Sequence, residues 1–238
     1  MTGGIMKKIG IVIFAAALIV GIVLANFFSF GRTTARLFNF SANFGGIAGS
    51  GNIVTDKRDV SDFRSIEVGG IFKVEVTAQK EFTVEVVADD NLLPIITTEV
   101  DGGVLKIGAE KHIKSHGPIL IRISAPDIKS IDASGASAVN IADMDNAEFS
   151  IESSGASKIT ASGKTQKLTV DVSGASRIGL EDLSAVDANV DASGASHVDL
   201  TANSSLVLDA SGASRITYSG DAKNIEKKSS GASSISPR

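Results

Sequence analysis

The chain has 238 residues, 43% of them hydrophobic, which is enough for one medium-sized domain with a sizeable core and an appendage. A net charge of −4 and the lack of any Lys/Arg run argue against a nucleic-acid partner. The absence of cysteine excludes disulfides, cysteine-ligated metals and thiol catalysis.

The first predicted element is an apolar segment at the N-terminus. Lys7 and Lys8 precede an uncharged stretch over residues 9–31, which is long enough to span a bilayer. We interpret residues 1–31 as an uncleaved signal-anchor, that is, a transmembrane helix; a signal peptide cleaved near residues 23–25 is the alternative. Both predict an extracytoplasmic domain in the bacterial cell envelope. The domain would be membrane-anchored in the periplasm or at the cell surface, or secreted if the segment is cleaved.

Residues 32–54 are rich in glycine and asparagine with interspersed phenylalanine, a composition typical of a linker. This linker would hold a domain over residues 55–238 away from the membrane.

The domain begins with short alternating segments. Residues 63–68, 71–77 and 82–86 alternate apolar and polar side chains, which predicts half-buried strands. Residues 104–107 and 119–123 predict further strands, and the polar stretch 109–117 between them predicts an exposed loop. No long segment with helical periodicity follows the N-terminal one, so we expect an all-β domain.

The tetrapeptide SGAS then occurs six times, starting at Ser134, Ser154, Ser173, Ser193, Ser211 and Ser230. Its intervals are 20, 19, 20, 18 and 19 residues. A fixed period of this length is typical of a solenoid, in which each repeat forms one coil of a stack.

Alignment of the repeats on SGAS places aliphatic residues at constant offsets. Ile131, Ile151 and Val170 stand three residues before the motif, and Val139, Ile159 and Ile178 stand five residues after its first serine. Further aliphatic positions lie two residues away on each flank, so each flank is predicted to be a short strand with one inward face. Equivalent residues of successive coils should stack about 4.8 Å apart.

The SGAS motif itself is predicted to be the corner between the two strands of a coil. Its glycine can adopt a positive φ, its alanine is expected to point inward, and its serines can bond to backbone or to the next coil. Nucleophilic serine would need a positioned base. Only the corner at Ser196 has a neighbouring histidine, His197, so we favour the structural role.

Two charged columns flank the corners and form the candidate binding face. The acidic column comprises Asp132, Glu152, Asp171, Asp191 and Asp209, and the basic column comprises Lys158, Arg177, His197 and Arg215. One interpretation is a solvated ladder of ion pairs across the corner. The other is a groove for Ca²⁺ or an anionic polysaccharide, although the calcium-binding nonapeptide is absent.

The last coil departs from this pattern. Lys227 replaces the aliphatic residue and Lys228 replaces the acid, which would discourage end-to-end pairing of strands and predicts a C-terminal cap.

Several segments resemble the head GIN domain family of putative auto-transporter adhesins. They are residues 58–60 followed by Phe63 and Ile66, then 70–74, 89–93, 103–107, and 125–126 leading to 134–137; the repeats continue the resemblance to Ser234. The resemblance implies a right-handed parallel β-helix, similar to pectin-lyase-type solenoids without their catalytic residues, and a role in cell adhesion. It implies no particular functional residues.

The sequence therefore predicts a non-enzymatic, membrane-tethered envelope protein with an adhesive, structural or binding role. We expect no catalytic, cofactor-binding or metal-binding residues, and the predicted partners are the membrane and a cell-surface polysaccharide or protein. The alternative is a carbohydrate-active β-helix that binds or cleaves an acidic polysaccharide. It would need its acidic and basic groups to converge at one site. A sensor is the third possibility, but the predicted cytoplasmic tail is too short for a signalling domain.

Overall fold

Strands account for nearly all the secondary structure of the computed structural model, which describes residues 45–115 and 117–238. Residues from Gly45 to Arg238 form one unit. The apolar segment expected at residues 1–31 and the first part of the expected linker, residues 32–44, lie outside the described residues. Among the residues that are described, none belongs to a helix long and apolar enough to cross a membrane.

The described residues contain seventeen strands and one short 3-10 turn. In chain order these are β1 (Ile47–Ala48), β2 (Ile53–Arg58), β3 (Ser65–Gly70), β4 (Phe72–Thr77), β5 (Thr83–Asp89), η1 (Leu93–Ile95), β6 (Ile96–Asp101), β7 (Val104–Ala109), β8 (Ile113–Lys114), β9 (Ile119–Ser124), β10 (Ser130–Gly135), β11 (Ala138–Ser153), β12 (Lys158–Val172), β13 (Arg177–Ala192), β14 (His197–Ala210), β15 (Arg215–Ser219), β16 (Asn224–Ser229) and β17 (Ser234–Pro237). The predicted all-β solenoid is thereby confirmed.

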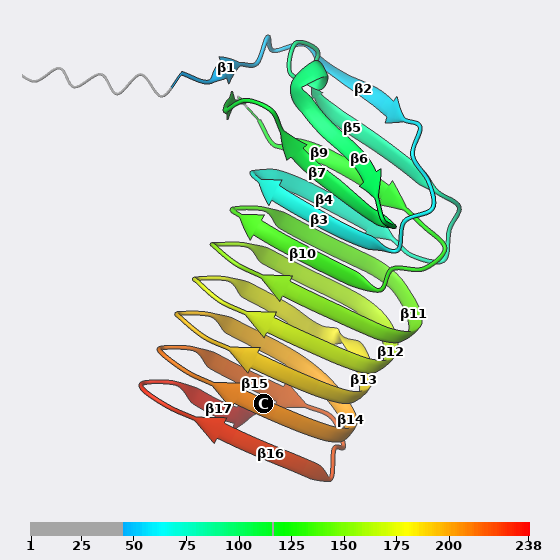
Figure 1. Cartoon of the computed structure of the whole chain (residues 1–238). Coiled ribbons are helices and arrows are strands. Elements are labelled where there is room, and N and C mark those ends of the chain that lie inside the picture. Colours follow the sequence, from blue (N-terminus) through cyan, green and yellow to red (C-terminus); the bar gives the residue numbers. More distant parts are fainter. Residues whose placement is uncertain (1–44, 116) are drawn as a thin grey trace, which may run out of the picture. The chain divides into compact units, whose positions relative to one another are not determined.

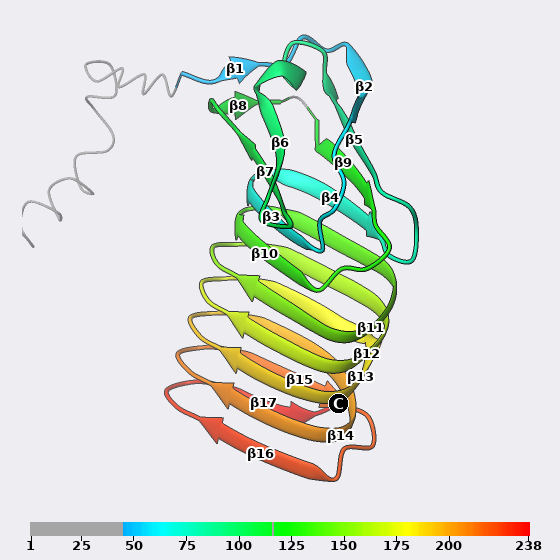
Figure 2. The same ribbon diagram turned by 45° about the vertical axis from the view of Figure 1, so that its right-hand side comes forward.

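The strands wind into two walls that enclose a single core (Figure 1). The first wall contains, in order of pairing, β6, β7, β3, β10, the C-terminal halves of β11 to β14, and β16. The second wall contains β2, β5, β9, β4, the N-terminal halves of β11 to β14, then β15 and β17. Each of β11 to β14 therefore bends from the second wall into the first (Figure 2).

The register of the repeats follows the sequence alignment. Ile131 pairs with Ile151, Ile151 with Val170, and Val170 with Val190, all between parallel strands. These four side chains are at most 1% exposed. At roughly 1.5–3 kcal/mol for each buried aliphatic side chain, such columns supply much of the stability of every coil.

The order of the coils differs from the order of the chain at the N-terminal end. Strand β10 pairs with β3, although β4 to β9 lie between them in the sequence. Strands β7 and β9 pair with the other edges of β3 and β4, so they form a coil that is inserted above the first one. The antiparallel strands β6, β5 and β2 then cover this end of the stack.

Part of the expected linker contributes to this end of the solenoid. Within residues 45–54, β1 pairs with β8 and β2 pairs with β5. Asp89, which is 1% exposed, accepts a hydrogen bond from the Gly51 N–H at 2.6 Å. Asn91 donates to the Ala48 carbonyl oxygen at 2.7 Å. The exposed loop predicted from residue 109 onward contains strand β8, which pairs with β1. Ile113 of this strand is buried, so this part of the predicted loop is not exposed.

The SGAS glycines adopt the left-handed backbone that the sequence predicted. Their φ angles lie between 71° and 91°. Each following alanine donates its N–H to the corner glycine one coil earlier, as Ala175 does to the Gly155 carbonyl oxygen at 2.7 Å. A Cβ on Gly174 would lie 2.4 Å from that same oxygen. The corners therefore stack so closely that only glycine fits.

The prediction that the SGAS alanines point inward is wrong. Ala136, Ala156 and Ala175 are exposed, whereas the serines that follow them are buried. The physical reason is that the inward position adjoins corner carbonyl groups that need donors. Ser196, 2% exposed, donates to the Ser193 carbonyl oxygen at 3.0 Å and so satisfies one of them.

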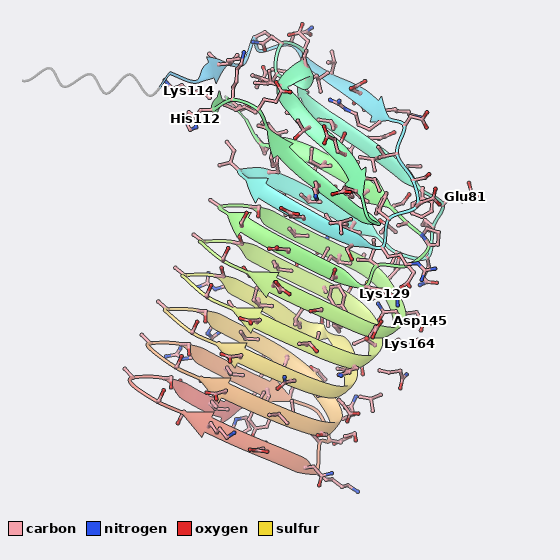
Figure 3. All side chains as sticks on the ribbon, in the orientation of Figure 1. Glu81, His112, Lys114, Lys129, Asp145 and Lys164 are labelled. Carbon is pink, nitrogen blue, oxygen red and sulfur yellow. The ribbon has the colours of Figure 1, made fainter. Side chains whose placement is uncertain are left out.

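The bends at the opposite edge of the stack have no such motif; strand pairing continues through them, as between Met144 and Gly163, and exposed ion pairs lie on their surface. Figure 3 shows Lys129, Asp145 and Lys164 near one another at this edge. Lys164 lies 3.1 Å from Asp145, and Lys129 lies 2.9 Å from Glu148. Because all four side chains are exposed, each pair contributes only about 0–1 kcal/mol.

Replacing a corner glycine should destabilise the whole stack. We expect Gly174→Ala to lower the free energy of unfolding by about 1–3 kcal/mol, because alanine is strained at this φ and its Cβ meets backbone. Urea unfolding followed by circular dichroism measures the change. Ala175→Ser, at an exposed position of the same corner, should stay within about 0.5 kcal/mol of the parent chain. Equal stability of the two variants would contradict the account of the corner.

Candidate functional site

The first wall carries a continuous line of carboxylates on its outer surface. Successive strands pair so that Glu67, Asp132, Glu152, Asp171, Asp191 and Asp209 lie in one row, which we call the acidic ladder. Lys106 on β7 follows Glu67 at one end, and Lys228 on β16 follows Asp209 at the other. Within residues 45–115 and 117–238, these six carboxylates make no ion pair.

Short polar side chains flank most of the acidic ladder, with Asn189 and the exposed Val207 at one end of the row away from the corner. On the side away from the corner, Ser150 and Thr169 share one row, and on the corner side Ser154 and Ser173 share another. Rows of short side chains leave a flat surface from which the carboxylates project. Such a surface favours an extended partner over a small molecule held in a pocket.

Like charges at the spacing of β-strands repel, and the pKa values of the ladder record this. Desolvation, followed by repulsion from Asp171 and Asp209, raises the pKa of the Asp191 carboxyl above its ordinary value. Desolvation, followed by repulsion from Glu67, likewise raises the pKa of Asp132. Asp132 and Asp191 therefore oppose folding at neutral pH, since their charged form is disfavoured in the stack.

The second wall carries the basic column in the same manner. Lys73, Lys158, Arg177, His197 and Arg215 occupy one row, with Ala138 between the first two; we call the five charged residues the basic ladder.

Partners of the basic ladder belong to the neighbouring row of the same wall. Lys73 lies 2.8 Å from Glu75, and His197 Nε2 lies 2.9 Å from Asp199. In the part of the chain that the structure describes, no ion pair joins the basic ladder to the acidic one. The predicted columns are therefore two separate surfaces on opposite walls, and the expected ion pairs across the corner do not form.

Two ladder members and one end of the acidic ladder were missed by sequence reasoning. Glu67 and Lys73 lie on β3 and β4, where Gly69-Gly70 stands in the register of Ser134-Gly135 and the SGAS motif is absent. Gly70 nevertheless has a φ of 123°, so the pair of glycines was the available signal. Lys106 belongs to the inserted coil and had no sequence signal.

The buried serines next to the basic ladder serve the corners. Ser196 points into the core, whereas the adjacent His197 is directed outward to Asp199. The histidine is thus not positioned to activate this hydroxyl. In the described ranges, no group of three or more His, Asp or Glu side chains is arranged to hold a metal ion.

The repeat breaks at two clefts near the N-terminal end. One, of about 450 Å³, is lined by Asp62, Arg64, Phe82 and Asp127, with Phe82 5.1 Å from the buried ring of Phe63. The other, of about 330 Å³, lies beside the expected loop and is lined in part by residues 69–72 and 109–113. Both are shallow interruptions of the walls, whereas the ladders run the length of the repeats.

A parallel β-solenoid with a charged row on each wall defines the class of this protein. Residues 62–222 match the family described as putative auto-transporter adhesin, head GIN domain, which is more than half of the chain. The chain belongs to this family, as its sequence indicated. No curated protein matches the sequence.

Solved structures of similar fold come from species of Bacteroides and Parabacteroides. A putative adhesin from Bacteroides fragilis is 19% identical with a TM-score of 0.67, covering 81% of this chain and 100% of its own. A putative adhesin from Parabacteroides merdae is 16% identical with a TM-score of 0.49, covering 81% and 99%. A putative lipid binding protein from Parabacteroides distasonis is 20% identical with a TM-score of 0.48, covering 81% and 99%. The first of these supports the fold.

Removing one charge from the middle of the acidic ladder should stabilise the protein. Because folding raises the pKa of Asp191, the unfolded chain releases this proton first as the pH rises, and the carboxyl then lowers the free energy of unfolding. We expect Asp191→Asn to raise that free energy at pH 7 by about 0.2–1 kcal/mol, and the gain to disappear as the pH falls below about 4.

Urea unfolding between pH 3 and pH 7, a range chosen to bracket the ordinary carboxyl pKa of about 4, measures this effect. The matched control is Asp187→Asn on the same strand, where the neighbouring row position holds Lys167 instead of a carboxylate. This control should not be stabilised. A gain for Asp187→Asn, or a gain for Asp191→Asn that persists in acid, would contradict the assigned repulsion.

Proposed function

We propose that this protein is a non-enzymatic adhesin of the bacterial cell envelope that binds extended surfaces through its two charged ladders. The observation that carries the proposal is the repetition of the same charge on successive coils of each wall. A repeated row offers many equivalent weak contacts, and such contacts reach useful strength only together. Membership of a family described as adhesins supports the same role.

Membrane tethering is part of this proposal. Its support is the apolar stretch over residues 9–31 behind Lys7 and Lys8. An uncleaved segment would leave the solenoid anchored on the extracytoplasmic side, and a cleaved one would release it. We also propose that the solenoid winds in the right-handed sense that the family resemblance implies. It agrees with the general preference for right-handed crossovers between parallel strands of one sheet.

A carbohydrate-active enzyme is the less supported alternative. Its acid and base would come from residues such as Asp171 and Arg177, which lie on different walls. Cleavage requires these groups to reach the same bond, whereas binding of an anionic polymer requires only the basic ladder. Binding without cleavage is therefore the form of this alternative that the geometry favours.

Attachment of cells should depend on the ladder charges. Cells that express the full chain should adhere to a surface coated with an anionic polysaccharide, and the Lys158→Glu, Arg177→Glu, Arg215→Glu variant should lose most of this attachment. The physical reason is that each reversed charge replaces an attraction by a repulsion. Counting retained cells under flow measures the effect.

The matched control reverses three cations outside the ladders, Lys129, Lys164 and Lys223, and changes the net charge by the same amount. It should attach like the parent. Equal loss in both variants, or no loss on removal of the whole chain, would contradict the proposal. Release of shortened polysaccharide from the coated surface would favour the enzyme instead.

A further inference from the structure

We propose that copies of this chain pack side by side, with the acidic ladder of one copy against the basic ladder of the next. The partner of each ladder is then a second copy of the same chain. The inference rests on the proposed function in one respect only, namely that the ladders are contact surfaces.

The two ladders match each other in height along the stack. In the four repeats whose motifs start at Ser154, Ser173, Ser193 and Ser211, the acid lies two residues before SGAS and the basic residue directly after it, as with Asp171 and Arg177 around the corner at residues 173–176. Asp209 and Arg215 flank the next-but-one corner in the same way. Both ladders have the spacing of hydrogen-bonded strands, about 4.8 Å, so they agree in period without any adjustment.

The acid and the base of a coil stand three residues before and three residues after its corner glycine, as Asp171 and Arg177 do around Gly174, and they lie on the two different walls of the ribbon in Figure 2. A neighbour displaced sideways, with no rotation and no shift along the stack, therefore presents its basic ladder to the acidic ladder of the first copy. Four carboxylates that make no ion pair within the described residues, Glu67, Glu152, Asp171 and Asp209, would then meet Lys73, Lys158, Arg177 and Arg215, whereas Asp191 would meet His197 and Asp132 would meet Ala138.

The ends of the ladders fix the register of this contact. Without an axial shift, Lys228 of one copy lies at the height of Ser234 of the next, and Lys106 lies at the height of Leu120. A shift by one coil would bring Lys228 opposite Arg215, or Lys106 opposite Lys73. Each shifted arrangement thus creates a like-charge contact that the unshifted one avoids.

The surfaces are flat enough to approach each other. The row beside the basic ladder on the second wall contains the short residues Thr160, Gly179 and Thr217, together with Asn140 and with Glu75 and Asp199, which are paired with Lys73 and His197. A contact of six coils by about five residues buries about 1,000 Å² in total, at the lower end for a specific interface. We therefore expect reversible association that weakens in high salt.

The contact uses two different surfaces and so does not close on itself. A heterologous contact generated by pure translation extends into an open row of parallel solenoids. Copies tethered to one membrane would already share the orientation that such a row needs.

Engineered cysteines can test this arrangement, since the chain has none of its own. Val207 on the first wall and Thr217 on the second lie beside the two ladders in the same coil. Under mild oxidation, the purified full chain carrying Val207→Cys and Thr217→Cys should give a series of disulfide-linked dimers, trimers and larger species. Either single variant should stay monomeric, and an equimolar mixture of the two should give dimers only.

The matched control pairs Val207→Cys with Asn140→Cys. Asn140 shares a row with Thr217 but lies four coils away, about 19 Å along the stack. This variant should not cross-link. Cross-linking of the control, dimers from a single-cysteine variant, or no cross-linking of the matched pair would overturn the proposal.

Charge reversal then tests the ladders as the cause. In the matched cysteine background, Asp171→Lys with Asp209→Lys places two cations in the acidic ladder, and Arg177→Glu with Arg215→Glu places two carboxylates at the same heights in the basic ladder. Each variant alone should cross-link at least about tenfold less, as expected for a loss of several ion pairs. A mixture of the two should recover the oligomers, which also shows that both variants are folded.

Cross-linking that survives charge reversal, or no recovery on mixing, would overturn the proposal. These outcomes are separate from those of cell attachment. Attachment to the anionic surface without self-association would leave the proposed adhesion intact and identify the anionic polymer as the partner. Self-association without attachment would support the row and remove the adhesive role.

Discussion

The fit of one glycine corner on the next is the constraint on which the rest of the structure depends. A hydrogen bond of 2.7 Å joins Ala175 to Gly155, and a side chain on Gly174 would collide with the same carbonyl oxygen. Because successive corners touch through backbone alone, the coils can neither tilt nor slip against one another. Each position at a fixed offset from the motif is then repeated in a straight row, whether it is an aliphatic residue in the core, such as Val170, or a charge outside, such as Asp171.

The charged rows are a consequence of this stacking and are costly by themselves. Desolvation and like-charge neighbours raise the pKa of Asp191, so the charged form of this ladder residue destabilises the chain that carries it. A partner that supplies cations at the same spacing would remove this cost. The basic ladder on the opposite wall has that spacing, since both are set by the same backbone hydrogen bonds. The same repeat therefore provides the stable fold and the charged ladders that we propose as the contact between copies.

The sequence predicted the repeated part of the molecule well, because the SGAS period places each residue of one coil over its equivalent in the next. The prediction failed where the direction of a side chain or the order of the strands depends on contacts between residues that are far apart in the sequence. Ala195 faces outward and Ser196 inward because the corner carbonyl of Ser193 needs a donor, which no hydrophobicity pattern reveals. The pairing of β10 with β3 depends on the excursion from β4 to β9, and no repeated motif marks it. The sequence identified both ladders but placed them on one face, because the spacing of residues does not give the angle through which the chain turns at the corner.

The central claim is that one charged residue per coil forms a straight row at the strand spacing. It is tested most directly by a distance measured along the acidic ladder. Spin labels at Ser130→Cys and Val207→Cys, in the row beside the ladder and four strands apart, report this distance by pulsed electron resonance. The account predicts a single narrow distribution centred near 19 Å between the labelled backbone positions. A broad distribution, or a centre displaced by a whole coil, would contradict it.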